Sequence, residues 1–150
     1  MPVKPLRLQH YLPYRLSVAA NAVSQLIARA YEDTFGLSIP QWRLIAVLAD
    51  EGPLTQQALC QRTLMDKVTV TRAAQALLRR RFVKRLPNIE DGRSHRLALN
   101  NAGEDLYKEV APLALEYEAK LLAGIERCEV EKLEQQLRLL EKAAAALSQR

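Results

Sequence analysis

The sequence has few aromatic residues and few glycines, and each shortage limits the folds and functions that the chain can have. Phe, Trp and Tyr make up 5% of the 150 residues, while apolar residues as a group make up 49%. The apolar content is therefore mostly aliphatic, with abundant Ala and Leu, which favours helix. With only five glycines, the chain offers no glycine-rich loop of the kind that cradles phosphates. Its length suits one compact domain, and its composition is that of a folded chain.

Cysteine and histidine are also scarce, which argues against several kinds of site. Cys60 and Cys128 are far apart, so we predict neither a disulfide framework nor a metal site built on a cysteine pair. Cys60 is interpreted as a core residue, whereas Cys128, near the start of the last helix, leaves a redox-responsive function as an alternative. His10 and His95 have no metal-ligand spacing, so no metal or cofactor is expected. Without a Ser-centred elbow or a paired-His motif, the sequence does not predict an enzyme.

Long apolar runs are missing as well. No uninterrupted run approaches the roughly 18 to 20 residues that a membrane span needs. The first 15 residues, MPVKPLRLQHYLPYR, are broken by prolines and charges and lack the apolar centre of a signal peptide. We therefore expect a cytoplasmic protein with no membrane partner.

Positive charge is what the sequence does have, and it is concentrated in one segment. Residues 62–96 hold ten Lys or Arg against three Asp or Glu, a net charge of +7. The whole chain carries +5, so the other 115 residues carry −2 (5 minus 7). A basic middle between nearly neutral flanks is typical of a protein that binds a polyanion. A solvated charged face is the alternative that charge alone leaves open.

The first part of the chain predicts two helices. Apolar residues at three-and-four spacing predict a long helix over 12–35, which Gly36 is placed to end. Ser38 followed three residues later by Gln41 is a capping box, and it predicts a second helix over about 40–51.

A helix, a sharp turn and a longer helix follow. Thr55 can cap a short helix over 56–63, and Asp66 can cap another over about 67–80. The longer helix is expected to bury one apolar stripe and to present a polar face, because residues three or four apart share a face. The stripe consists of Val70, Ala73, Ala74 and Leu77, and the polar face of Thr69, Thr71, Arg72, Gln75 and Arg79.

After this helix the spacing of the apolar residues changes to one typical of strands, and a helical spacing returns near residue 100. FVKRLPN (82–88) and SHRLALN (94–100) read as strands, and Asp91-Gly92 between them is a turn signal, so we predict a two-stranded hairpin. Asn100 can cap a helix that runs to about Gly124 and bends at Pro112. A last helix has near-heptad apolar spacing at Val130, Leu133, Leu137, Leu140, Ala144 and Leu147.

This order of elements suits the DNA double helix. A single helix fits the major groove with its N-terminal residues against base edges, while the preceding helix crosses the backbone. Arg and Lys can pair with guanine, and Gln75 can pair with adenine. Arg93 at the hairpin tip can enter a narrow minor groove.

In these pieces the sequence resembles the MarR family of transcriptional regulators. The matching stretches are IPQWRLIAVLADEGPLTQQALCQRT, MDKVTVTRAAQALLRRRFVKR and EDGRSHRLALNNAGEDLY, and the resemblance covers essentially the whole chain. It implies a mainly α-helical fold with a small β-hairpin, a winged helix-turn-helix flanked by dimerisation helices. The single MarR-like domain of 1–150 would then divide into a DNA-binding region, 38–99, and a helical dimerisation region, 10–36 and 101–150.

The resemblance also implies a function and a set of DNA contacts. The protein would be a homodimeric repressor on a pseudo-palindromic double-stranded operator, with Arg93 in the minor groove and Asp91 orienting it or a neighbouring Arg. A helical dimer that binds a protein partner through its basic face is an alternative. The expected DNA-binding residues are Lys67, Thr69, Thr71, Arg72, Gln75, Arg79, Arg93 and Arg96.

Members of the family often release DNA when a small aromatic acid binds. By resemblance we expect a phenolic acid or its coenzyme A thioester as the effector, with aromatic walls and one cation around it. Arg15 is the cation that we favour, because it lies among the apolar positions of the first helix. The expected effector-binding residues are Tyr11, Tyr14, Arg15 and Trp42, with Tyr31 and Tyr107 as further candidates; packing of the aromatic rings between helices is the alternative.

Two positions depart from the family pattern. Arg81 stands where the family commonly has glycine at the end of the recognition helix, so it must either adopt a positive φ or end the helix differently. Asn100 replaces the usual Thr cap, which is chemically equivalent.

Overall fold

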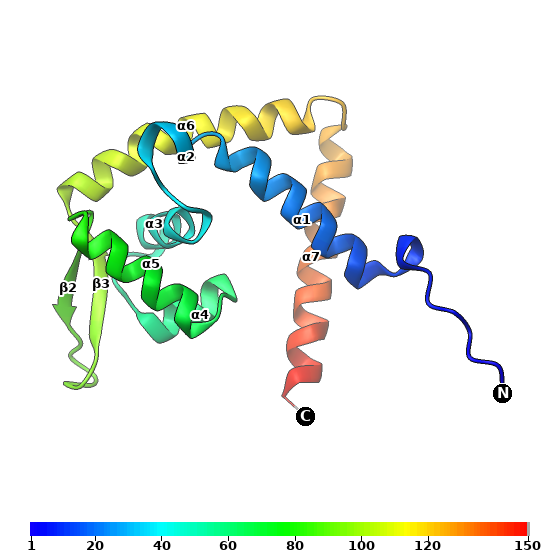
Figure 1. Ribbon diagram of the computed structural model, residues 1–150, viewed down its shortest axis with the longest axis horizontal. Coiled ribbons are helices and arrows are strands. Elements are labelled where there is room, and N and C mark those ends of the chain that lie inside the picture. Colours follow the sequence, from blue (N-terminus) through cyan, green and yellow to red (C-terminus); the bar gives the residue numbers. More distant parts are fainter. Residues whose placement is uncertain (150) are drawn as a thin grey trace. The chain divides into compact units, whose positions relative to one another are not determined.

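The computed structural model describes residues 1–149 and is mostly helical (Figure 1). Residues 1–114 form one compact unit, and the chain from Leu115 onwards forms a second. The elements in chain order are a 3-10 turn η1 (Leu8–His10), α1 (Leu12–Ala28), α2 (Glu32–Phe35), α3 (Ile39–Glu51), β1 (Leu54–Thr55), α4 (Gln56–Thr63), α5 (Lys67–Arg79), β2 (Val83–Pro87), β3 (His95–Leu99), α6 (Asn101–Leu122) and α7 (Arg127–Ser148).

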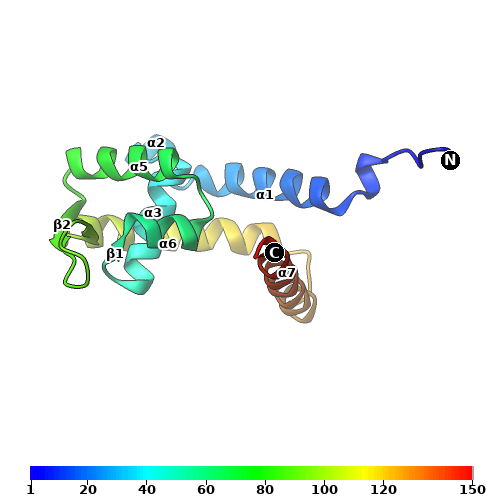
Figure 2. The same cartoon turned by 90° about the horizontal axis from the view of Figure 1, so that it is seen from below.

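The core of the first unit lies between α3, α4, α5 and the sheet. The predicted stripe of α5 is buried, with Val70, Ala74 and Leu77 at 0% exposure. This stripe fixes α5 against α3 and α4, and the opposite face of α5 is left to solvent (Figure 2). Further buried residues of this unit include Leu44, Ile45, Leu48, Leu59, Val83, Leu97, Leu106 and Val110.

The helix starts that the sequence predicts are confirmed by side-chain caps. Each cap gives a partner to a backbone N–H that the helix itself leaves unpaired. At α3, Ser38 and Gln41 form the full capping box. The other three bonds run to Thr55 from Ala58 (3.1 Å), to Asp66 from Thr69 (2.8 Å) and to Asn100 from Gly103 (2.8 Å).

The prediction of one helix over 12–35 is wrong. α1 ends at Ala28, and the backbone N–H groups of Ala30 and Tyr31 bond three residues back, to Ile27 and Ala28, which tightens the chain into a turn. The short α2 follows and ends at Gly36, whose φ is +65°. The break turns the Tyr31 ring inward, where only 2% of the residue is exposed. The apolar spacing continues across the break, which is why periodicity missed it.

The hairpin is confirmed, but the sheet has three strands where two were predicted. β2 and β3 pair antiparallel from Val83↔Leu99 to Pro87↔His95. The added strand, β1, pairs with the other edge of β3 through Leu54↔Leu97 and Thr55↔Arg96. A two-residue strand is too short to show alternation, so only the folded chain reveals it. β1 ties the start of α4 to the hairpin.

The exit from α5 is settled by the backbone at Arg81. Its φ is +61°, so this non-glycine residue adopts the left-handed conformation, which costs about 1–2 kcal/mol. The N–H of Phe82 bonds to the carbonyl of Leu77 (3.0 Å), as in a Schellman ending. The Asn100 side-chain amide donates to the carbonyl of Arg81 (2.6 Å). The two departures from the family pattern therefore contact each other.

The helices after the sheet differ in how they are packed. α6 passes through Pro112 without interruption, and its first half contributes Gly103, Leu106 and Val110 to the core. None of the described residues of α7 is buried. The near-heptad leucines of α7 therefore remain at the surface, and Leu133 is 49% exposed.

We predict that Gly103→Ala destabilises the protein strongly. A Cβ at Gly103 would overlap the Phe82 carbonyl oxygen and lie 3.2 Å from Leu99 Cδ2. The obstacle is backbone, which cannot rotate away, so we expect a loss of about 3 kcal/mol, at the upper end of overpacking costs. Urea unfolding measures it. Gly92→Ala, which meets nothing within 4 Å, is the control, and equal midpoints for both variants would contradict the prediction.

Candidate nucleic-acid interface

A helix-turn-helix is formed by α4, a three-residue turn and α5. Leu64 ends α4 in the left-handed conformation (φ +54°), and its N–H bonds to the carbonyl of Cys60 (2.8 Å). The Thr63 hydroxyl donates to Leu59 O (2.6 Å) and accepts from the N–H of Met65 (3.3 Å). Side-chain and backbone bonds thus fix the angle at which α5 leaves the turn.

Asp66 organises the first turn of α5. Its two carboxylate oxygens accept from the N–H and from the hydroxyl of Thr69, at 2.8 and 2.9 Å. These two bonds stabilise the charged form and hold the pKa of Asp66 below its ordinary value. As a result, the hydroxyl of Thr69 already has a partner within the chain, at the protein surface.

The outward face of α5 differs from the predicted one in its composition. Thr71 is half-buried, and its hydroxyl donates to Gln56 Oε1 of α4 (3.2 Å), so it bonds the two helices together. Two of the predicted base readers, Thr69 and Thr71, therefore have internal partners. Val68, which the sequence did not predict to lie on this face, is 58% exposed. The exposed residues of α5 are Lys67, Val68, Arg72, Gln75 and Arg79.

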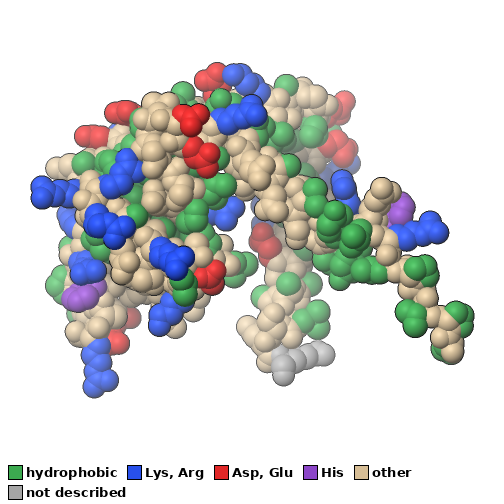
Figure 3. Space-filling model, viewed as in Figure 1, with side chains coloured by type: hydrophobic (Ala, Val, Ile, Leu, Met, Phe, Trp, Pro, Cys, Tyr) green, Lys and Arg blue, Asp and Glu red, His purple; other side chains and the backbone are tan. Residues whose placement is uncertain are grey.

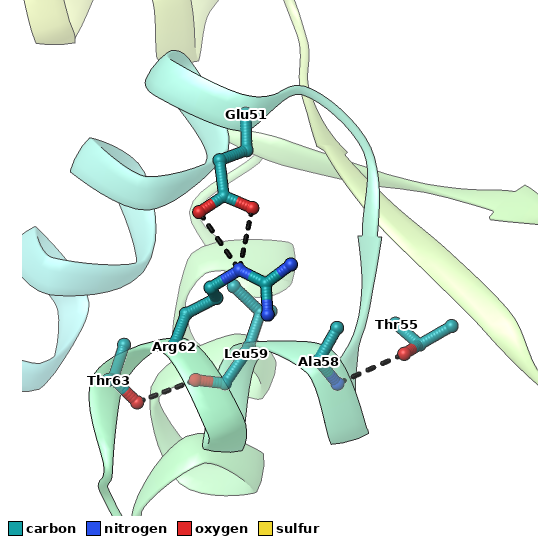
Figure 4. A network of polar contacts seen from close by, with 6 residues as sticks. All are labelled: Glu51, Thr55, Ala58, Leu59, Arg62 and Thr63. Carbon is teal, nitrogen blue, oxygen red and sulfur yellow. Dashed lines mark hydrogen bonds and ion pairs between the residues drawn. The ribbon is translucent and has the colours of Figure 1, made fainter. Parts of the chain in front are cut away.

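Two arginines of the basic segment have partners within the chain. Arg62 pairs with Glu51, its Nε lying 3.0 and 2.8 Å from the two carboxylate oxygens (Figure 4). Arg80 donates to the carbonyls of Phe35 (2.7 Å) and Gly36 (3.0 Å), and its guanidinium lies 5.0 Å from the Phe82 ring centroid. Arg80 thereby joins the end of α5 to the end of α2.

The other cations of the segment are not neutralised. Within residues 1–149, Arg62 is the only one of the ten Lys and Arg of 62–96 with a carboxylate within 4 Å. Lys and Arg side chains gather on the face that carries α5 and the hairpin (Figure 3). Uncompensated positive charge over a protruding helix and an adjacent hairpin matches the electrostatic surface that a nucleic-acid backbone requires.

The tip of the hairpin is held by Asp91. Its Oδ1 accepts from the backbone N–H of Arg93 (3.0 Å), and its carbonyl accepts from the N–H of Ser94 (3.2 Å). Asn88 closes the base of the turn by donating to the Ser94 hydroxyl (2.8 Å). Asp91 thus shapes the backbone at Arg93, and the exposed guanidinium has no carboxylate partner in the described chain.

Arg96 is the second residue of β3 and lies next to the hairpin loop. It pairs with Leu86 of β2 and Thr55 of β1, and its side chain is half-buried. Its Nε is buried without a hydrogen-bond partner. Together with Asn88 and Glu90, Arg96 lines a depression of about 410 Å³ beside the sheet.

The residues predicted to bind an effector are not gathered in one cavity. Tyr11 lies at the start of α1 in a depression with residues 4–7 and His10, and Tyr14 and Arg15 are exposed on α1. Trp42 is stacked between Tyr31 and Tyr107, with ring centroids 5.6 and 5.8 Å apart. The alternative interpretation, packing between helices, is the arrangement seen for Trp42.

Tyr107 also lines a cavity that the sequence did not predict. The cavity measures about 460 Å³ and lies among the end of α3, strands β2 and β3, and the start of α6. Leu48, Leu86 and Ala98 make its apolar floor, and the exposed Lys84 and Lys108 stand at its edge. No sequence signal identifies it, because its residues come from three separate stretches.

The structure gives little support for a redox-active cysteine pair, a metal site or a membrane span. Cys60 is half-buried and Cys128 is exposed, and both are free thiols. Residues 1–149 contain no group of three His, Cys, Asp or Glu side chains placed to hold a metal ion. None of the helices described is both long enough and apolar enough to cross a membrane.

The helix-turn-helix and the adjoining hairpin define a winged-helix DNA-binding protein. Residues 35–94 match the model of the MarR family. The chain is 30% identical over 116 residues to the HTH-type transcriptional regulator YwoH of Bacillus subtilis, covering 75% of this chain and 84% of that regulator. The chain belongs to the MarR family, and it is a DNA-binding transcriptional regulator; the family's members are regulators and not enzymes.

Solved structures share the fold over nearly the whole chain. A MarR/EmrR family regulator from Acinetobacter sp. ADP1 superposes with a TM-score of 0.85 at 24% identity, over 94% of this chain and 99% of that one. Bordetella bronchiseptica BpsR, whose DNA binding is regulated by 6-hydroxynicotinic acid, superposes with a TM-score of 0.80 at 20% identity, over 92% and 98%. At these identities the likeness establishes the fold.

We predict that Arg80→Ala destabilises the protein and that Arg79→Ala does not. Arg80 donates two hydrogen bonds to backbone carbonyls, whereas its neighbour Arg79 is exposed without a carboxylate partner. Charge-assisted bonds at an exposed site are expected to contribute about 1 kcal/mol. Arg80→Lys should recover part of that loss, since an ammonium replaces the guanidinium fork imperfectly. Thermal unfolding of the three variants tests this, and equal stability of Arg80→Ala and Arg79→Ala would contradict it.

Proposed function

We propose that the protein is a homodimeric repressor that binds a pseudo-palindromic operator and leaves it when a small aromatic acid, or its coenzyme A thioester, binds. The unpaired cations on α5 and on the hairpin carry the first part of this proposal, because duplex DNA is the polyanion that a winged helix fits. A regulator of this kind works where the chromosome is, so we place it in the cytoplasm.

Exposed apolar surface supports the dimer. The residues from Leu6 to Val23 leave several large apolar side chains exposed, among them Leu12 (52%) and Val18 (40%). In the second unit, α7 exposes Leu137 and Leu140 at heptad-like spacing. A monomer rarely leaves so much apolar surface in water. We therefore assign 10–36 and 101–150 to a dimerisation region and 38–99 to a DNA-binding region within one MarR-like domain.

Dimer symmetry sets the proposed binding mode. The two copies of α5 would enter successive major grooves, about 34 to 36 Å apart. Within each half-site, the exposed face of α5 meets the bases, with Arg72 and Gln75 as polar readers. Arg93 enters the minor groove from the wing, where Asp91 holds the backbone of its turn. Thr69 and Thr71 act at this surface mainly by fixing its shape, and Arg96 supports the wing next to its loop.

Substituting Arg72 or Arg93 should weaken operator binding without unfolding the dimer. Each loss of a base or groove contact is expected to cost about 1–3 kcal/mol per site. Where the lost contact is to a phosphate, the log-log salt slope should also fall by about 0.9 per contact. Gel shifts of Arg72→Ala and Arg93→Ala at several salt concentrations, with sedimentation to check the dimer, measure both effects.

Arg62→Ala is the matched control for this experiment. Arg62 belongs to the same basic segment, but its charge is paired with Glu51, so its removal should leave affinity and salt slope nearly unchanged. If both groove variants bind as tightly as the natural protein, the assigned interface is wrong. A protein partner for the basic face would be indicated if duplex affinity showed no linear dependence on salt at all.

The effector proposal rests on the family and on two places in the structure. BpsR, which shares the fold, responds to an aromatic acid. In this chain Arg15, among the exposed aromatic residues Tyr11 and Tyr14 of the first helix, is the cation that we favour for the carboxylate. The cavity bordered by Lys84 and Lys108 is the other place that offers apolar walls and cations.

Thermal-shift screening of aromatic acids and their coenzyme A thioesters should yield a compound that stabilises the protein and releases the operator. Binding at a hundred times the dissociation constant adds about 2.7 kcal/mol to stability. Arg15→Gln should abolish the response, whereas Lys108→Gln should keep it. Trp42 is the only tryptophan of the chain and stacks on Tyr107, so its fluorescence reports a ligand in the cavity instead.

The two variants, Arg15→Gln and Lys108→Gln, distinguish between the two possible effector sites. Loss of the response in Lys108→Gln alone would move the effector site to the cavity. A response that persists in both variants, or a screen in which no compound releases DNA, would contradict the proposed effector binding at Arg15.

A further inference from the structure

Val68 is an exposed apolar residue at the front of the recognition helix. It is the second residue of α5 and is 58% exposed, whereas Val70 and Leu77 of the same helix are fully buried. Within α5 it is the only large apolar residue left exposed. Its place, in the first turn of the helix, is where a helix in the major groove comes closest to the bases.

The fold gains nothing evident from a valine at this position. More than half of Val68 is exposed, and a β-branched side chain is somewhat unfavourable in a helix because its χ1 rotation is restricted. The hydrogen bonds of this turn are made by Asp66 and Thr69, and none of them involves the Val68 side chain. Nothing in the packing of this helix explains the choice of residue.

The residues around Val68 belong to the basic surface that we propose binds DNA. Val68, Arg72, Gln75 and Arg79 follow one another at spacings of four, three and four, so they form a single outward stripe that Val68 begins. Lys67 stands beside it, and neither Lys67 nor Arg72 has a carboxylate within 4 Å in the described chain. The methyl groups of Val68 therefore lie at the end of a cationic stripe.

Polar base reading is restricted at this turn. The hydroxyl of Thr69 is bound to Asp66, and that of Thr71 is bound to Gln56. Beside the Lys67 ammonium, what the first turn offers to a base edge is then the pair of methyl groups of Val68. In the major groove, the C5-methyl group of thymine is the base feature that an apolar side chain recognises.

We infer that Val68 is a specificity-determining residue that contacts a thymine C5-methyl group at one position of each operator half-site. This inference rests on the proposed function, because it requires α5 to enter the major groove. It adds an apolar contact to a surface for which only polar readers were expected.

The experiment separates the methyl group of the base from every other property of the operator. A duplex is first selected from a random pool by the natural protein, and each thymine of its half-sites is then replaced singly by deoxyuridine, which lacks only the C5-methyl group. Gel shifts compare the natural protein, Val68→Ala, Val68→Thr and Arg72→Ala, all at one salt concentration.

We expect one thymine position per half-site at which deoxyuridine weakens binding by the natural protein about fourfold, the effect of one buried methyl group. Val68→Ala should bind the thymine duplex more weakly by a similar factor and should no longer distinguish thymine from deoxyuridine there. Val68→Thr keeps one methyl group and should retain part of the distinction. Arg72→Ala should bind more weakly overall while keeping it.

The outcomes distinguish failure of the inference from failure of the proposed function. If no duplex is enriched, sequence-specific binding itself fails and the inference falls with it. If a duplex is enriched but no thymine is sensitive, or Val68→Ala and Val68→Thr distinguish thymine from deoxyuridine as the natural protein does, the inference is overturned while the proposed function stands. Because Val68 is exposed, thermal unfolding should confirm that its variants remain folded.

Discussion

Burial of one stripe of α5 is the constraint on which the rest of the molecule depends. Val70, Ala73, Ala74 and Leu77 are held against α3, α4 and the sheet, and because helical residues three and four apart share a face, this burial decides what faces outward. A rotation of the helix by one residue would hide Arg72 and expose the core. The Asp66 cap and the left-handed Leu64 then set where the helix starts. The basic surface is thus a consequence of apolar packing.

The charges of the segment divide into two groups with different physical roles. Arg62 and Arg80 satisfy partners inside the chain, a carboxylate and a pair of helix-end carbonyls. The remaining cations repel one another without local compensation, a mild cost that a folded protein tolerates when a polyanion neutralises the surface. The Asp91 carboxylate likewise has a partner within the chain, because it accepts a hydrogen bond from the backbone N–H of Arg93. The Arg93 guanidinium is therefore left without a carboxylate partner in the described chain. Internal bonding, more than the number of charges, therefore decides which cations of the segment have partners within the chain.

Much of the architecture could be predicted because its signals are local. Ser38, Thr55, Asp66 and Asn100 each bond within three residues, so their sequence neighbours suffice to identify them. The break at residues 29–31 and strand β1 could not be predicted in this way. Both exist because distant residues meet: Tyr31 packs on Trp42, and Leu54 pairs with Leu97. The hydrogen bond between Thr71 and Gln56 likewise joins residues fifteen apart, so the sequence could not show that this hydroxyl is engaged.

The sequence by itself determined the family, the order of elements, the helix caps and the buried stripe of α5, since these follow from periodicity and from bonds between near neighbours. The tertiary structure determines which side chains on the basic surface have no internal partner. The side chains of Thr69 and Arg80 form hydrogen bonds within the chain, whereas Val68 is exposed. The difference arises because the availability of a side chain depends on which residues the folded chain places beside it.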